Sequence, residues 1–144
     1  MSAENLKALV RFRLEQAEEA LKAGEVLLSA GFTREVVNRA YYAMFYAVLA
    51  LLAARKKETS KHRGAISLFD MEFVKPGMFD KDFSEWIHAA FNLRLRSDYS
   101  PLFKVSVDDA KALLAKADRF VAGAQSCLAD FLSAANAASE SEMP

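Results

Sequence analysis

An uncharged run of fifteen residues, Ala40 to Ala54, constrains the fold of this chain more than any other feature. The run contains no glycine or proline, and it is rich in alanine and leucine with aromatic residues interleaved. A helix that is apolar on nearly every side must be buried on most sides, and fifteen residues are fewer than the ~20 that span a bilayer. We therefore expect residues 33–55 to form the central helix of a soluble bundle, without a membrane span.

The length of the chain suits a single domain, because 144 residues can enclose a hydrophobic core without a metal or a disulfide. Hydrophobic residues make up 53% of the sequence. This excess has two explanations that stay open here. Either some apolar surface meets a partner, or the chain is simply an alanine-rich helical protein.

Charge and cysteine content exclude several classes of function. Basic and acidic residues balance at 19 each, so the chain as a whole is not a strongly basic nucleic-acid binder, although a local basic site is compatible with this balance. The only cysteine, Cys127, fits a reducing cytoplasm. Charges recur from Glu4 to Arg13, so we expect no signal peptide. Only two histidines accompany the cysteine, and the common metal and nucleotide motifs do not occur, so we expect no metal site and no cofactor.

Apolar residues at three- and four-residue steps predict further helices on either side of the central one. Their expected ranges are 4–30, 62 to about 74, 81 to about 98, and 107 to about 134. Because alternation of polar and apolar residues never persists, no strand is expected. The sequence thus predicts an all-α, up-and-down bundle of four to five helices in one domain over residues 1–136, followed by a disordered tail over 137–144.

Short connections and capping residues define the expected helix ends. Gly31 is expected to end the first helix, because glycine accepts a left-handed C-terminal cap most readily. The short link that follows predicts an antiparallel helical hairpin. Side chains that accept hydrogen bonds from backbone N–H groups are favoured at N-caps, and the expected N-caps of the later helices are Thr33, Ser60, Asp80 and Ser106.

Polar residues at the start of the central helix form the first candidate site. Asn38 and Tyr42 are four residues apart and share a helix face, with Arg39 beside them. A partly buried arginine needs a carboxylate, a phosphate or carbonyl groups around it. Two interpretations stay open: an internal ion pair that holds helices together, or a site for a phosphate.

A second candidate site lies near the end of the fourth predicted helix. Arg94 and Asp98 are four residues apart and can pair along the helix. If helices two and four pack together, Arg94 also approaches Arg39, and an anion must then separate the two guanidinium groups. Asp98 is one candidate for that anion. A phosphate bound in a bidentate manner is the other.

A third candidate site is the basic segment Lys61-His62-Arg63 at the start of the third predicted helix. A helix N-terminus with basic side chains is a favourable anion site. Three solvated charges after a loop, however, need no function. His88, on the fourth helix, is expected to be a partly exposed packing residue.

Three blocks of the sequence, taken in order, resemble the HEPN family (higher eukaryotes and prokaryotes nucleotide-binding domain), in its small stand-alone prokaryotic branch. They are Asn38-Arg39-Ala40-Tyr41-Tyr42-Ala43-Met44-Phe45, then Lys61-His62-Arg63-Gly64 with the apolar residues that follow it, and then Leu93-Arg94 with Ser97-Asp98-Tyr99. The resemblance covers about residues 5–125. It implies an all-α bundle that usually forms a homodimer.

The resemblance also implies a function. Many relatives act as the toxin of a toxin–antitoxin pair whose other member is a minimal nucleotidyltransferase. Active members are metal-independent ribonucleases with an arginine, four to six variable residues and then a histidine, and the dimer brings two such motifs together across a cleft. Arg94 matches the motif arginine, but Tyr99 stands where the histidine would be. A tyrosine near this motif is a nucleotidylation target in some relatives.

The missing histidine leaves enzyme activity open, because tyrosine, with a reference pKa of about 10, is a poor base at neutral pH. The favoured hypothesis is a toxin-like subunit that binds a nucleotide or RNA phosphate through an Arg-centred cleft, with Asn38, Arg39, Tyr42, His62 and Arg94 as the binding residues. The first alternative is an active ribonuclease that uses Arg94 with Asp98, Tyr99 or His62. The second alternative is a purely structural dimerisation domain.

Overall fold

The computed structural model describes the backbone of residues 2–142 and the side chains up to residue 134. Within this range it contains helices and no strand. The helices are α1 (Ala3–Ser29), α2 (Thr33–Ala54), α3 (His62–Phe69), α4 (Lys81–Tyr99) and α5 (Val107–Glu142), and a π-helical segment, Asp70–Val74, continues α3. The predicted all-α bundle is confirmed.

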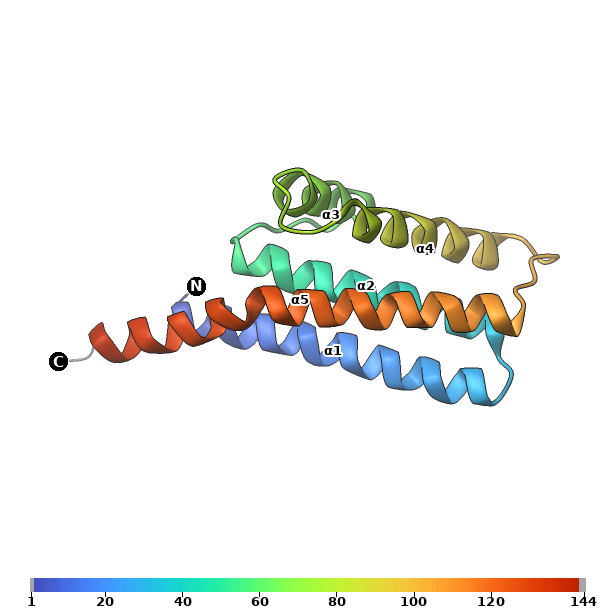
Figure 1. Cartoon of the computed structure of the whole chain (residues 1–144), viewed down its shortest axis with the longest axis horizontal. Coiled ribbons are helices and arrows are strands. Elements are labelled where there is room, and N and C mark those ends of the chain that lie inside the picture. Colours follow the sequence, from blue (N-terminus) through green and yellow to red (C-terminus); the bar gives the residue numbers. More distant parts are fainter. Residues whose placement is uncertain (1, 143–144) are drawn as a thin grey trace.

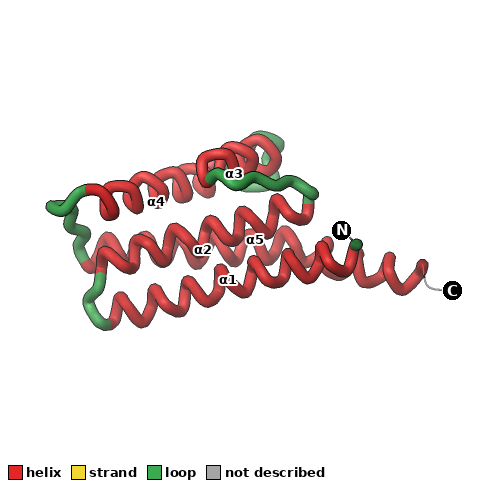
Figure 2. Tube along the Cα trace, turned by 180° about the vertical axis from the view of Figure 1, so that it is seen from behind, coloured by secondary structure: helices red, strands yellow, loops and turns green. Residues whose placement is uncertain are grey.

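The long helices run alternately up and down, with α2 at the centre (Figure 1). Helix α2 packs against each of the other α-helices, and its most extensive contact is with its hairpin partner α1. Seen from both sides, α3 and α4 lie on one side of α2, and α1 lies on the other (Figures 1 and 2). This arrangement places the basic start of α3 and the end of α4 over the same helix.

The apolar composition of α2 accounts for its central position. Most of its side chains are buried, and they include the large residues Tyr41, Met44 and Leu51 at 0% exposure. By length and composition alone α2 is the one described helix that could cross a membrane, but 72% of its most apolar window is buried inside the bundle. The hydrophobic run is therefore used to form the core.

The turn between α1 and α2 shows why Thr33 is not an N-cap. Gly31 has a φ of +85°, and the N–H groups of Gly31 and Phe32 donate to the carbonyls of Leu28 and Leu27 at 3.1 and 2.9 Å. This is a glycine-ended helix terminus of the Schellman type, as expected for Gly31. The chain enters α2 at once, and Phe32 is the N-cap residue, without a side-chain bond. The prediction that Thr33 caps α2 is therefore wrong by one residue.

The remaining helix ends follow the sequence pattern with small differences. Asp80 occupies the N-cap position of α4, although its side chain makes no capping bond. Ser106 Oγ accepts from the Asp109 N–H at 3.0 Å. The predicted cap at Ser60 is wrong, because the Lys61 carbonyl already accepts from the Ala65 N–H at 3.0 Å and Lys61 is the N-cap of α3.

Helix α5 extends to Glu142, beyond the expected end near residue 134. The segment contains no glycine or proline between Gly123 and Pro144 that would end a helix earlier. Residues 143–144, and the side chains from residue 135 on, lie outside the described part. The expected domain boundary at residue 136 and the disordered tail therefore stay predictions.

The contact between α4 and α5 generates a stability prediction. A Cβ atom added to Gly123 would lie 2.7 Å from Phe83 Cε2 and 2.9 Å from Phe83 Cζ. The Phe83 ring is packed and cannot move aside as the end of a flexible side chain can. The added methyl group should therefore cost about 1–3 kcal/mol through overpacking, which is more than the ~1 kcal/mol that alanine gains over glycine in helix propensity. We expect Gly123→Ala to lower the free energy of unfolding, measured by urea denaturation.

Gly24→Ala is the matched control. Its added Cβ would lie 2.8 Å from Leu114 Cδ1, the end of a flexible side chain that can rotate away. We expect this variant to be less destabilised than Gly123→Ala. An equal or larger loss at Gly24 would contradict this account of the packing.

Candidate functional site

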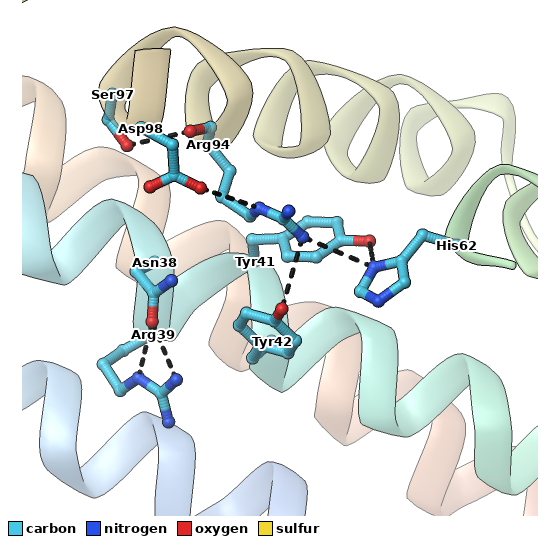
Figure 3. Close-up of polar contacts among 8 residues, drawn as sticks. All are labelled: Asn38, Arg39, Tyr41, Tyr42, His62, Arg94, Ser97 and Asp98. Atoms are coloured by element: carbon cyan, nitrogen blue, oxygen red, sulfur yellow. Dashed lines mark hydrogen bonds and ion pairs between the residues drawn. The ribbon is translucent and has the colours of Figure 1, made fainter. Parts of the chain in front are cut away.

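The Arg94 side chain of α4 lies over α2 and is the centre of the candidate site (Figure 3). Its Nη1 lies 3.3 Å from the Tyr42 hydroxyl and 3.4 Å from His62 Nδ1. Its guanidinium carbon also lies 5.2 Å from the Tyr41 ring centre and 5.5 Å from the Tyr42 ring centre, within the range of cation–π attraction. Three segments of the chain, the start of α2, the start of α3 and the end of α4, therefore meet at one arginine.

The positive charge of Arg94 is only partly compensated. Asp98 Oδ2 lies 3.5 Å from Arg94 Nε, with side-chain exposures of 44% for Asp98 and 16% for Arg94. This approach lacks hydrogen-bond geometry, so Arg94 Nε is a buried donor without a hydrogen-bond acceptor. Because exposed i,i+4 pairs contribute only a few tenths of a kcal/mol, Asp98 is a weak counterion. The arginine can still accept another anion.

His62, the first residue of α3, brings an imidazole to Arg94. The ring stacks on Phe45 with 4.1 Å between ring centres, and Nδ1 lies 2.8 Å from the Tyr41 hydroxyl oxygen. Burial lowers the pKa of His62 below its ordinary value, and the neighbouring Arg94 charge lowers it further. His62 is therefore held in its neutral form beside a permanent cation.

Tyr41 is a site residue that the sequence analysis did not select. Its side chain is fully buried, and burial raises the pKa of its hydroxyl well above the usual range, although Arg94 acts in the opposite direction. The hydroxyl consequently keeps its proton. The sequence did contain a signal for this residue, because a tyrosine inside an otherwise apolar buried run needs a hydrogen-bond partner for its hydroxyl.

Asn38 and Arg39 lie apart from the Arg94–His62 contact. Asn38 Oδ1 accepts from Arg39 Nε and Nη2 at 3.0 and 2.7 Å, and Figure 3 shows the Arg39 side chain directed towards α1. In the part of the chain that the structure describes, Arg39 is connected to the site through Tyr42, whose ring centre lies 5.4 Å from its guanidinium carbon. The structure thus brings Tyr42, His62, Arg94 and Asp98 together. Among the described contacts, Asp98 does not bridge Arg39 and Arg94.

Neither Tyr99 nor Arg63 contacts Arg94 within the described residues, and both are exposed. Tyr99 follows Asp98 at the end of α4 and is 79% exposed. Arg63 is exposed and its guanidinium carbon lies 5.0 Å from the Phe91 ring centre. His88, by contrast, lies in a separate hydrogen bond, with its Nε2 2.7 Å from Asp70 Oδ2.

Two cavities of about 400 Å³ lie away from Arg94. The first is lined by the start of α1, the end of α2 and the loop after it, and the second by residues 77–83 and 123–127. No group of three or more histidine, cysteine, aspartate or glutamate side chains suited to a metal occurs within the described residues. The groups available at the site are therefore one arginine, one imidazole, two phenolic hydroxyls and the carboxylate of Asp98.

The pKa of His62 generates a prediction about stability and pH. Because this pKa is lower in the folded chain than the ordinary value of about 6.5, the unfolded chain binds the proton more readily in the interval between the two values. The contribution of His62 to stability is thus present above about pH 6.5 and is lost as the pH falls towards the folded value. We expect His62→Gln to reduce the loss of unfolding free energy between about pH 7.5 and pH 5.5, measured by urea denaturation.

His88→Gln is the control for this measurement, because it removes the other histidine and leaves His62 in place. It should retain the pH-dependent loss that His62 causes. If His62→Gln loses as much stability on acidification as the unsubstituted chain, the described environment of His62 is wrong.

Comparison with known proteins agrees with this architecture. The model of the HEPN domain matches residues 10–126. "Putative toxin MJ0142" of Methanocaldococcus jannaschii is 36% identical over 108 residues, which cover 75% of this chain and 74% of that protein. "Putative toxin MJ0605" of the same organism is 33% identical over 129 residues, with 90% and 92% covered.

A UPF0332 protein of Thermotoga maritima is also similar, with 32% identity over 122 residues that cover 85% of this chain and 92% of that protein. The family match spans most of the described bundle and includes Tyr41, His62 and Arg94. The chain therefore belongs to the HEPN domain family, and its relatives include proteins named as toxins.

Proposed function

We propose that this protein is the toxin-like subunit of a two-component system, and that it binds the phosphate of a nucleotide or an RNA through Arg94. The observation that carries the proposal is the unsatisfied charge of Arg94, whose buried Nε lacks a hydrogen-bond acceptor and whose nearest carboxylate is half exposed. A buried guanidinium normally has its donors paired. Because Nε is closed to solvent, a phosphate, which suits arginine, would pair with the guanidinium through its Nη groups and supply the negative charge that Asp98 provides only weakly.

The neighbours of Arg94 support a phosphate ligand over a carboxylate side chain from the same chain. The Tyr42 hydroxyl at 3.3 Å and the neutral His62 ring at 3.4 Å add hydrogen-bonding groups without adding negative charge. The start of α3, whose N-cap Lys61 makes no side-chain capping bond, would add a favourable dipole for an anion. The site would thus attract an anion by charge and orient it by hydrogen bonds.

We place the protein in the cytoplasm, as a homodimer with a nucleotidyltransferase-like antitoxin as its partner. The relatives named as putative toxins support a toxin role. A second copy would complete a cleft over the Arg94 site, in the manner that the family resemblance implies. Tyr99, which is exposed at the end of α4, would be open to modification by such a partner.

A metal-independent endoribonuclease is the second candidate function. One observation favours it: the structure brings His62 to 3.4 Å from Arg94, so an arginine and a histidine meet in space although the motif position holds Tyr99. In this alternative, Arg94 would stabilise the charge that develops on phosphorus, and His62 would transfer the proton. The purely structural dimerisation domain remains the third hypothesis, and it predicts no ligand at Arg94.

Binding of a fluorescein-labelled oligoribonucleotide, followed by anisotropy, tests the first candidate. We expect Arg94→Ala to weaken binding by roughly 10- to 100-fold, because a charge-assisted hydrogen bond contributes about 1.5–3 kcal/mol. Arg96→Ala is the matched control. Arg96 lies two residues further along α4, is exposed, and packs on the Phe103 ring at 5.2 Å.

Arg96→Ala should change affinity by no more than a few-fold, since it removes one solvated charge. Equal losses in the two variants would show unspecific attraction and contradict an Arg94 site. Absence of binding by the unsubstituted chain to both the oligoribonucleotide and ATP would overturn the phosphate-binding proposal.

Incubation with total RNA in EDTA tests the second candidate. If the protein is a ribonuclease, cleavage should persist in EDTA and should disappear in Arg94→Ala and His62→Ala, each shown to be folded by circular dichroism. Arg96→Ala should remain active. No cleavage by the unsubstituted protein, or equal cleavage by the Arg94 variant, would remove this candidate.

A further inference from the structure

The hydrogen bonds around His62 determine which of its ring nitrogens carries the proton. Nδ1 lies 2.8 Å from the Tyr41 hydroxyl and 3.4 Å from Arg94 Nη1. An arginine can only donate hydrogen bonds, whereas a hydroxyl can donate or accept. If Nδ1 carried a proton, that N–H would face the N–H groups of Arg94. Nδ1 is therefore the acceptor of both contacts.

The surroundings of Tyr41 favour a hydrogen bond from its hydroxyl to His62 Nδ1. Its side chain has no exposed surface, and His62 Nδ1 is the one acceptor that its hydroxyl meets among the described residues, because the neighbouring Arg94 can only donate to that hydroxyl. A buried hydroxyl that leaves its proton unpaired destabilises the folded protein. Donation from Tyr41 to Nδ1 satisfies the hydroxyl and places the single proton of the neutral imidazole on Nε2.

The Nε2 edge of His62 is open to a ligand. Figure 3 shows the second ring nitrogen on the edge that faces away from the Tyr41 and Arg94 contacts. This atom has no hydrogen-bond partner among the described residues, and it is not one of the buried atoms that lack a partner. An Nε2–H group at this edge can donate a hydrogen bond to an incoming oxygen atom.

We propose that Tyr41 is a positioning residue that holds His62 as the neutral Nε2–H tautomer, so that His62 donates a hydrogen bond to a phosphoryl oxygen bound at Arg94 and does not act as a base. This inference rests on the proposed phosphate-binding function and assigns a role to each residue within it. Arg94 supplies the positive charge, and His62 supplies an Nε2–H donor for the phosphoryl oxygen. Tyr41 determines that the imidazole proton is on Nε2. Phe45 supports the arrangement by stacking on the imidazole at 4.1 Å between ring centres.

The tautomer also separates the two candidate functions. A histidine that acts as a general base at its outer nitrogen needs a lone pair there, with its inner N–H held by an acceptor such as a carboxylate or a carbonyl. At His62 the inner nitrogen meets two donors, and the carboxylate of Asp98 lies beside Arg94 Nε. The site is thus arranged for binding an anion, and proton abstraction at Nε2 would require this arrangement to change.

Nitrogen-15 NMR of the His62 ring, in the ligand-free protein at a pH where the ring is neutral, tests the tautomer directly. We expect the protonated signal on Nε2 and the acceptor signal on Nδ1. In Tyr41→Phe we expect a mixture of tautomers, because the strongest donor to Nδ1 is gone. The matched control is Tyr42→Phe, which removes a hydroxyl that contacts Arg94 but not Nδ1, and it should leave the signals in place.

Two results would overturn the proposal at this stage. A proton on Nδ1 in the unsubstituted protein would refute the tautomer. A spectrum of folded Tyr41→Phe that matches the unsubstituted protein would refute the role of Tyr41. Because no ligand is present, both results are independent of whether the protein binds phosphate.

Substitutions of His62 test its role as a donor, with the same labelled oligoribonucleotide as the ligand. The amide nitrogen of glutamine can occupy the place of Nε2, so His62→Gln should keep binding within about 3-fold of the unsubstituted protein, whereas His62→Ala should lose roughly 10-fold. Equal losses in both variants would refute the donor role. If the unsubstituted protein shows the Nε2–H tautomer but no binding, the proposed function fails and the assignment of the proton stands.

Discussion

Burial of most of α2 inside the bundle is the constraint on which the rest of this structure depends. A polar group on the buried part of such a helix cannot reach water, so it must find a partner within the protein. Tyr41 is fully buried and its hydroxyl reaches His62 at the start of α3. Tyr42, one residue further, reaches Arg94 on α4. These two contacts link the central helix to α3 and to α4.

A second set of contacts, made by Arg34, fixes the end of α4. Arg34, in the first turn of α2, donates through Nη2 to the carbonyls of Ser100 and Phe103, at 3.2 and 2.7 Å. These bonds attach the connection after α4 to the start of α2, and they hold the segment with Arg94 and Asp98 against the central helix. The position of the candidate site therefore depends on two arginines with different roles. Arg34 has its charge satisfied by backbone carbonyls, while Arg94 retains a donor without an acceptor.

Much of the fold could be predicted from the sequence, because helical periodicity and glycine or proline breakers act locally. The uncharged run predicted the central helix, and Gly31 predicted the turn before it. The N-caps at Thr33 and Ser60 were predicted wrongly, because a cap depends on which carbonyl first accepts an intrahelical bond, and in both places a neighbouring residue does so. The π-helical continuation of α3 at Asp70–Val74 carried no sequence signal that separates it from an α-helix.

The candidate site was only partly predictable for a different reason. Arg94 and Asp98 could be paired from their spacing on one helix, whereas the approach of His62 to Arg94 joins residues 32 positions apart. That contact depends on the path of the loop between α2 and α3, which periodicity does not describe. Arg39 was expected beside Arg94, but its guanidinium pairs with the neighbouring Asn38. The spacing of residues on a helix face does not predict which of these partners an arginine takes.

The absence of a histidine at position 99 does not remove the imidazole from this site, because His62 supplies one from another helix. What changes is the chemistry available to that ring. A histidine on the motif helix could turn towards an acceptor, but His62 is confined between the Tyr41 hydroxyl, the Arg94 guanidinium and the Phe45 ring. Two donors at Nδ1 favour the neutral ring with its proton on the open edge. In our proposal, the buried Tyr41 hydroxyl therefore has two roles. Its hydrogen bond to His62 satisfies a polar group of α2, and it also fixes the imidazole in the form that binds an anion and does not remove a proton.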